Sequence, residues 1–144
     1  MEDEEMNHNE IMSIIEKAMK EEYQYGKNDC NIVALRIVDL LCGTEWSKIA
    51  NYKSLKTGLE QLNNLGFDST QDIIIKECKE VEIPIDGDIW LDDHNPLIMG
   101  VVVSGRLLGV NESHDAFELH NKKKNGKYYR GIKKWDQVVE YLEH

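Results

Sequence analysis

The chain has 144 residues, a formal net charge of −10 and a sequence pI near 4.9. Its negative charge argues against sequence-independent binding to nucleic acids and to anionic membranes. No apolar run reaches the roughly 20 residues that span a bilayer, and the acidic start lacks the basic-then-apolar order of a signal peptide. We therefore expect one domain over residues 1–144, cytoplasmic on synthesis and not secreted by a signal of its own.

The first part of the chain predicts helices. Apolar residues at helical spacing follow an acidic N-terminal extension, residues 1–8, and predict an amphipathic helix that ends near Tyr23. Asp29 is a good N-cap for a second helix, and Gly43 is a good C-cap. The residues between these two caps are apolar on nearly all sides, which is typical of a buried central helix.

Two weaker helical patterns follow, over residues 54–65 and 70–78. After Pro84, short β-branched or alternating runs are separated by Gly, Asn and Asp, and they predict an antiparallel meander. The lysine-rich segment 120–135 predicts a turn or hairpin, and a last short helix is expected over residues 135–142. Helices followed by strands indicate an α+β fold, with the N-terminal helices packed on one face of a C-terminal antiparallel sheet.

The cysteines and histidines argue against several kinds of site. The three cysteines, Cys30, Cys42 and Cys78, form no C-x-x-C pair, which argues against a disulfide framework and a zinc knuckle and favours a reducing compartment. The five histidines are dispersed, without the spacing of metal ligands. We therefore expect no metal and no other cofactor.

Cys30 follows the N-cap Asp29, so its sulfur is expected at the first turn of the central helix. Unpaired N–H groups and the positive end of the helix dipole stabilise a thiolate, and they can lower a cysteine pKa below its free value of about 8.5. Free cysteines are also commonly small, buried and inert. Position alone leaves both interpretations open.

The segment YQYGKNDCNIVALRIVDLLCGTEW resembles the nucleophile region of the NlpC-type cell-wall peptidases and, more closely, a phage-encoded branch of that papain-like superfamily. Such proteins carry a Tyr and a Gly ahead of an Asp-Cys that opens the central helix, here Tyr25, Gly26, Asp29 and Cys30. GDIWLDDHNPLIMGVVVSGRLLGVNES looks like the first two core strands of the family. The resemblance implies an NlpC-type fold, with Cys30 in the place of the nucleophile and Tyr25 either beside the sulfur or covering the core.

The catalytic histidine of that family has no counterpart at its expected position. In the peptidases a His two residues ahead of the strand glycine accepts the thiol proton, and here that position is Ile98, which cannot carry a proton. The polar residue that orients the imidazole falls at Asn111, a residue type that papain-like enzymes accept there. A turn contact is the alternative role for Asn111.

Another histidine could substitute as the base. His94 precedes the second core strand, and His114 follows Asn111, so the side chain of either could reach Cys30. His120 is favoured least, because strand alternation puts it on the face opposite Phe117.

Three functions remain open, and the sequence leaves undecided whether the protein is an enzyme. Loss of the expected His favours a degenerate NlpC-type domain that serves as a phage virion or tail structural or assembly protein, with other virion or tail proteins as partners. The second is an active cysteine hydrolase that cleaves peptidoglycan peptide or amide bonds and binds cell-wall peptide. The third is an acidic intracellular binding module that pairs with a basic partner through surface charge.

Overall fold

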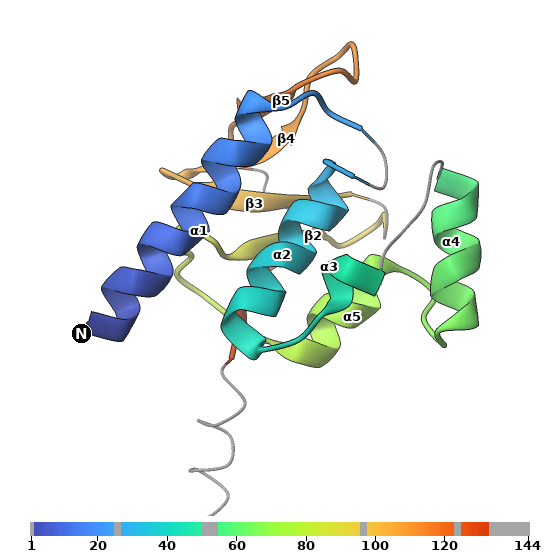
Figure 1. The fold of residues 1–144 in the computed structure, drawn as a ribbon, viewed down its shortest axis with the longest axis horizontal. Coiled ribbons are helices and arrows are strands. Elements are labelled where there is room, and N and C mark those ends of the chain that lie inside the picture. The colour runs from blue at the N-terminus through green and yellow to red at the C-terminus, as the bar shows by residue number, and fades with distance from the viewer. Residues whose placement is uncertain (1, 25–26, 50–54, 96–97, 123–124, 133–144) are drawn as a thin grey trace, which may run out of the picture.

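The computed structural model describes residues 2–24, 27–49, 55–95, 98–122 and 125–132. A layer of helices packs on a six-stranded antiparallel sheet (Figure 1), so the predicted α+β class with an antiparallel sheet is confirmed. The helices are α1 Glu2–Lys20, α2 Cys30–Cys42, α3 Trp46–Ile49, α4 Leu55–Asn64 and α5 Thr70–Glu77. The strands are β1 Cys78–Val81, β2 Ile89–Asp92, β3 Met99–Val103, β4 Arg106–Val110, β5 Phe117–His120 and β6 Gly126–Gly131.

The strand order in the sheet is β1-β6-β2-β3-β4-β5, with every neighbouring pair antiparallel. Strands β2 to β5 form the predicted meander. A turn or hairpin was expected over residues 120–135. The hairpin is wrong, because β6 does not pair with β5 and lies between β1 and β2. The end of the helix predicted over 70–78 is also different, since Cys78 begins strand β1.

Helix α1 begins at Glu2, so residues 2–8, predicted as a separate acidic extension, form its first turns. Its buried residues Ile11, Ile15 and Ala18 recur at helical spacing and join the core between helices and sheet. No helix among the described residues has the length and apolar character that crossing a bilayer requires. The helix predicted over 135–142 lies outside the described residues.

Helix α2 lies across the sheet beside α1 (Figure 1), and its position is set at both ends and along its length. Asp29 Oδ1 accepts a hydrogen bond from Ile32 N at 2.8 Å, and Gly43 ends the helix with a left-handed φ of 71°, as predicted. Its buried residues are Ile32, Val33, Ala34, Leu35, Ile37, Val38 and Cys42. Full burial of one aliphatic side chain is worth roughly 1.5–3 kcal/mol, so this packing fixes where Cys30 lies.

The Gly-Asp pair ahead of β2 has a structural role in this chain. Gly87 has φ +91°, and a Cβ there would lie 2.8 Å from Ile11 Cγ2. Asp88 is 1% exposed and accepts hydrogen bonds from Arg130 Nε at 2.9 Å and Nη2 at 2.8 Å. The backbone N–H of Ile85 donates to the same carboxylate at 2.7 Å. The hydrogen bonds to Asp88 raise the pKa of Arg130, and the pair ties the start of β2 to β6.

Candidate functional site

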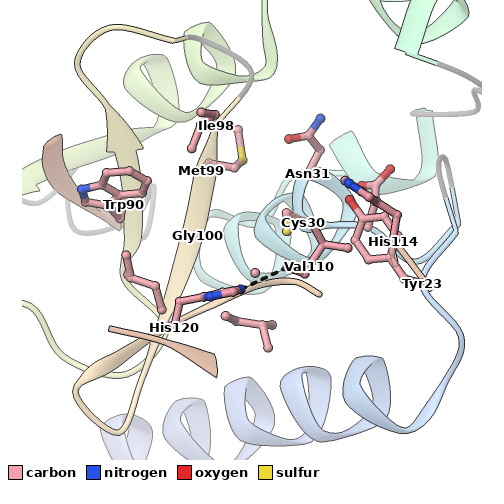
Figure 2. Close-up of a pocket in the computed structure, with 14 residues that line it drawn as sticks. Tyr23, Cys30, Asn31, Trp90, Ile98, Met99, Gly100, Val110, His114 and His120 are labelled. Carbon is pink, nitrogen blue, oxygen red and sulfur yellow. Dashed lines mark hydrogen bonds between the residues drawn. The ribbon is translucent and has the colours of Figure 1, made fainter. Parts of the chain in front are cut away.

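A pocket of about 400 Å³ lies between the first turn of α2 and strands β3 and β4 (Figure 2). Its polar side chains come from the segment before α2, the first turn of α2, the β4–β5 connection and the end of β5. They are Tyr23, Asp29, Cys30, Asn31, His114 and His120. Its apolar side chains come from three neighbouring strands and from the residue before β3: Trp90, Ile98, Met99, Leu107, Leu108 and Val110. The pocket therefore has an apolar wall from strands β2 to β4. Its hydrogen-bonding groups lie at and before the start of α2, on the β4–β5 connection and on β5.

Two glycines leave the space that the pocket occupies. Ladder pairing between β3 and β4 ends at Val101 and Leu108, and Gly100 and Gly109 come next on their strands. A Cβ on Gly100 would lie 3.3 Å from Leu107 Cβ, and one on Gly109 would lie 2.7 Å from His120 Cδ2. A side chain at Gly109 would displace the His120 ring, and one at Gly100 would press on Leu107, so the shape of the pocket depends on both glycines.

Cys30 lies at the start of α2, as the sequence predicts, and it lines this pocket. Its position left two interpretations open, a lowered pKa and an inert buried thiol, and the direction of the pKa shift favours the second. Burial of the thiol and the nearby Asp29 carboxylate raise the pKa of Cys30 to about 12, while hydrogen bonds from the Tyr23 side chain and the helix backbone offset only part of that rise. The helix terminus is thus outweighed, and the thiol keeps its proton at neutral pH.

His120 is the site residue that sequence reasoning favoured least. Strand alternation holds, since Phe117 packs in the core between helices and sheet while His120 belongs to the other face of β5. Its imidazole nevertheless projects into the pocket (Figure 2), because Gly109 on the neighbouring strand has no side chain to block it. The Nε2–H donates to the carbonyl oxygen of Val110 at 3.1 Å, which leaves Nδ1 as an acceptor in the neutral ring.

The two other candidate histidines lie in different places. His114 is exposed, has a left-handed φ of 57° and lines the pocket, next to Asp115, whose carbonyl accepts a hydrogen bond from Tyr23 N at 2.9 Å. His94 is exposed in the β2–β3 connection, where its backbone N–H donates to Asp92 Oδ2 at 2.9 Å, and it does not line the pocket. Of the two proposed substitutes, the structure brings only His114 to the site.

Of the remaining residues singled out from the sequence, Ile98 lines the pocket, whereas Asn111 does not. Asn111 makes the turn contacts of the alternative interpretation: its Nδ2 donates to Asp115 Oδ1 at 2.7 Å and its Oδ1 accepts from Asp115 N at 3.1 Å. Among the described residues, the Asn111 side chain makes no hydrogen bond to an imidazole. Ile98 lines the pocket at the position where the family resemblance expects a base. Tyr25 lies outside the described residues, and Tyr23 is the tyrosine whose side chain bonds the Cys30 thiol.

The site therefore combines a protonated thiol with two imidazoles but no thiol–imidazole pair. Among the described residues, no hydrogen bond joins Cys30 to His114 or His120. The same part of the chain contains no group of three or more His, Cys, Asp or Glu side chains that could hold a metal ion. In this arrangement the pocket can bind a ligand, whereas nucleophilic attack would need a base within reach of the sulfur.

Comparison with known families matches residues 5–124 to a family described as a domain of unknown function, DUF6950. The chain belongs to the DUF6950 family. No curated protein and no solved structure matches it. The matched range contains every residue that lines the pocket, so the site of this DUF6950 member lies within its family domain.

The raised pKa of Cys30 predicts a loss of stability at alkaline pH. The folded state holds the thiol proton to about pH 12, whereas the unfolded thiol loses it near its ordinary pKa of 9.0. The stabilising contribution is complete below pH 9 and falls as pH rises towards 12, by at most about 1.4 kcal/mol per pH unit. Urea unfolding between pH 8.5 and 11 should therefore show a shallower decline for Cys30→Ala than for the wild type.

Cys78 must be separated from this effect. The hydrogen bond with the Cys42 thiol raises the pKa of Cys78 as well, so its titration destabilises the protein in the same direction. Both cysteines are kept in the Cys30→Ala variant, and the difference between the two curves isolates Cys30. Parallel curves over the whole pH range would contradict the raised pKa.

Proposed function

We propose that this DUF6950 member is a degenerate NlpC-type cysteine-hydrolase-like domain that binds a partner without cleaving it. Its role is that of a structural or assembly protein of a phage virion or tail. The NlpC-type likeness and the virion role rest on the sequence segments around Cys30 and from Gly87 to Ser113.

The observation that carries the loss of catalysis is the state of the Cys30 thiol. Its pKa of about 12 leaves almost no thiolate at neutral pH. The imidazole of His120 donates to the Val110 carbonyl. By the sequence resemblance, Ile98 falls at the position where that family has its base. A cysteine hydrolase needs the thiolate and an adjacent base, and these contacts supply neither.

A second candidate, an active cysteine hydrolase, has one observation in its favour. Cys30, His114 and His120 line the same pocket. For hydrolysis the His120 ring would have to leave Val110, turn towards the sulfur, accept its proton and later donate it to the leaving amine. Hydrogen bonds of catalytic groups can be incomplete in the absence of ligand, so activity has to be measured directly.

Incubation with purified cell-wall sacculi tests the two candidates against each other. Soluble fragments released by the wild type and by Cys30→Ala are quantified by mass spectrometry, with an active NlpC-type peptidase as the positive control. We expect the wild type to release no more than Cys30→Ala and no more than buffer. Release that depends on Cys30 would overturn the proposal in favour of the hydrolase.

The assembly role needs a second assay in the phage that carries this chain. Cys30→Ala should leave the number of infectious particles unchanged, because binding does not use the thiol as a nucleophile. Deletion of the whole domain should reduce particle number strongly. A deletion that leaves particle number and composition unchanged would refute an assembly role.

A further inference from the structure

The two cysteines outside the pocket lie next to each other in the fold. Cys42 ends helix α2 and is buried, whereas Cys78 begins β1, the outermost strand in the order of the described sheet, and is partly exposed. The Cys42 thiol donates to the carbonyl oxygen of Glu77 at 3.5 Å, and this carbonyl belongs to the peptide bond that Glu77 forms with Cys78. In the sequence the two cysteines are separated by residues 43–77, which include α3, α4 and α5.

The register of the sheet puts both sulfurs on one face. Cys78 is the cross-strand partner of Gly131 in the β1–β6 ladder, and side chains directly opposite each other on two strands share a face. A Cβ on Gly131 would lie 3.2 Å from Cys42 Sγ and 2.8 Å from Leu41 Cβ. The Cys42 sulfur therefore lies beside Cys78, close to the position that a side chain at residue 131 would take. Gly131 lets the last turn of α2 approach the ladder this closely.

The two thiols are in direct contact. The Cys78 side chain is hydrogen-bonded to Cys42. A thiol has one proton, and that of Cys42 goes to the Glu77 carbonyl, so Cys78 is the donor and Cys42 Sγ the acceptor. A disulfide needs Cβ atoms about 3.5–4.5 Å apart and sulfurs about 2.05 Å apart. Sulfurs that already touch on one face of the sheet reach this geometry through small side-chain movements, while α2 stays packed on the sheet.

We infer that Cys42 and Cys78 form a reversible disulfide with a low-molecular-weight disulfide as the oxidant, and that this bond fastens the end of α2 to β1. Cys78 reacts first because it is the partly exposed sulfur. Its thiolate attacks one sulfur of the small disulfide and releases one small thiolate, which leaves a mixed disulfide on Cys78. The Cys42 thiolate then attacks the Cys78 sulfur and releases the second small thiolate.

The exchange balances without any further reactant. Two protein thiols and one small disulfide become one protein disulfide and two small thiols, and the released thiolates take up the two protons that the protein loses. A pool of reduced small thiols drives the same exchange backwards, so the pair stays reduced in a reducing compartment. The thiolate is the attacking form, and the hydrogen bond to Cys42 raises the pKa of Cys78. Closure therefore becomes faster as the pH rises above neutrality.

The pair is separate from the pocket. Cys42 and Cys78 do not line the pocket, and Cys42 is at the opposite end of α2 from Cys30. The inference therefore does not depend on the proposed binding function.

Incubation of the full chain with oxidised glutathione at pH 8.5 tests the inference. Remaining thiols are blocked with iodoacetamide in denaturant, and the non-reduced digest is analysed by mass spectrometry. We expect peptides joined through Cys42 and Cys78, alkylated Cys30, and an intact chain that loses two hydrogen atoms on oxidation. The bond closes a long loop and restricts the unfolded chain, so Tm should rise by roughly 10 °C over the reduced protein. Added reductant should return Tm to its former value.

Three variants separate the steps. Cys42→Ala removes the second sulfur, so glutathione should remain attached to Cys78 as a mixed disulfide. Cys78→Ser removes the accessible sulfur and should leave Cys42 unmodified, with no rise in Tm. Cys30→Ala is the matched control, and it should form the Cys42–Cys78 bond and gain the same Tm as the wild type.

The wild-type result decides the inference even if a variant fails to fold. Unmodified Cys42 and Cys78 after oxidation, a bond from Cys30 to either of them, or chains joined only between molecules would overturn it. An oxidised chain that melts no higher than the reduced one would overturn the fastening of α2 to β1.

Discussion

Replacing Arg130 by alanine is expected to lower the free energy of unfolding by about 3 kcal/mol. The Asp88 side chain is 2% exposed, and the substitution removes the two hydrogen bonds that the guanidinium donates to its carboxylate. Among the residues that the structure describes, only the Ile85 backbone N–H then remains bonded to this buried carboxylate. Removing one partner of a buried ion pair usually lowers the free energy of unfolding by about 3–5 kcal/mol. We expect the lower end of this range because the Arg130 side chain is itself 37% exposed. Urea unfolding at neutral pH measures the loss.

Lys127→Ala is the matched control on the same strand. Its ammonium lies 3.8 Å from Glu80 Oε1, and both side chains are more than half exposed. An exposed pair of this kind contributes about 1 kcal/mol or less. Adding Asp88→Asn to Arg130→Ala removes the buried charge and should recover part of the lost stability. If Arg130→Ala and Lys127→Ala lower the free energy of unfolding equally, the buried Arg130–Asp88 pair does not hold β6 to the start of β2.

Helix α2 could be predicted almost completely because its signals are local. Asp29 and Gly43 cap it at the expected residues, and the apolar stretch between them is buried. The N-cap also correctly predicted that Cys30 lies in the first turn. A cap acts on backbone groups within one turn, so its identity and position can be read from adjacent residues alone.

Strand β6 could not be predicted in the same way. It pairs with β1 through Tyr128 to Gly131 and with β2 through Gly126 to Tyr129, partners that are distant in sequence. No local pattern in the lysine-rich segment distinguishes this insertion from a hairpin. The Arg130–Asp88 pair is part of what favours the observed order, and it forms only after β6 and β2 are neighbours.

The chemistry of the site depended on tertiary contacts that the sequence does not show. The sequence left open whether the helix terminus lowers the pKa of Cys30, and in the structure burial and Asp29 raise it. The face assigned to His120 was correct, and the residue nevertheless lines the pocket. Gly109, diagonal to His120 in the register of β4 and β5, lets the ring cross the strand into the pocket. A glycine diagonal to a histidine was the available signal, and it has meaning only once the register is known.

The Cys30 thiol is expected to react with iodoacetamide at pH 7.5 about a thousandfold more slowly than an unperturbed cysteine. The thiolate is the reactive form, and its fraction at neutral pH falls tenfold for each unit of pKa. A rise from 9.0 to about 12 therefore lowers that fraction about a thousandfold. Mass spectrometry of digested protein gives the alkylation rate of Cys30 separately from those of Cys42 and Cys78.

Asp29→Asn is the variant that isolates the charge beside the thiol. Asparagine caps helices as well as aspartate does, so the hydrogen bond to the Ile32 N–H can remain while the negative charge is lost. The pKa of Cys30 should then fall, and alkylation should become faster without a comparable loss of stability. An alkylation rate in the wild type above that of a free thiol would mean that the helix terminus or an imidazole activates Cys30, and it would favour the hydrolase over the binding domain.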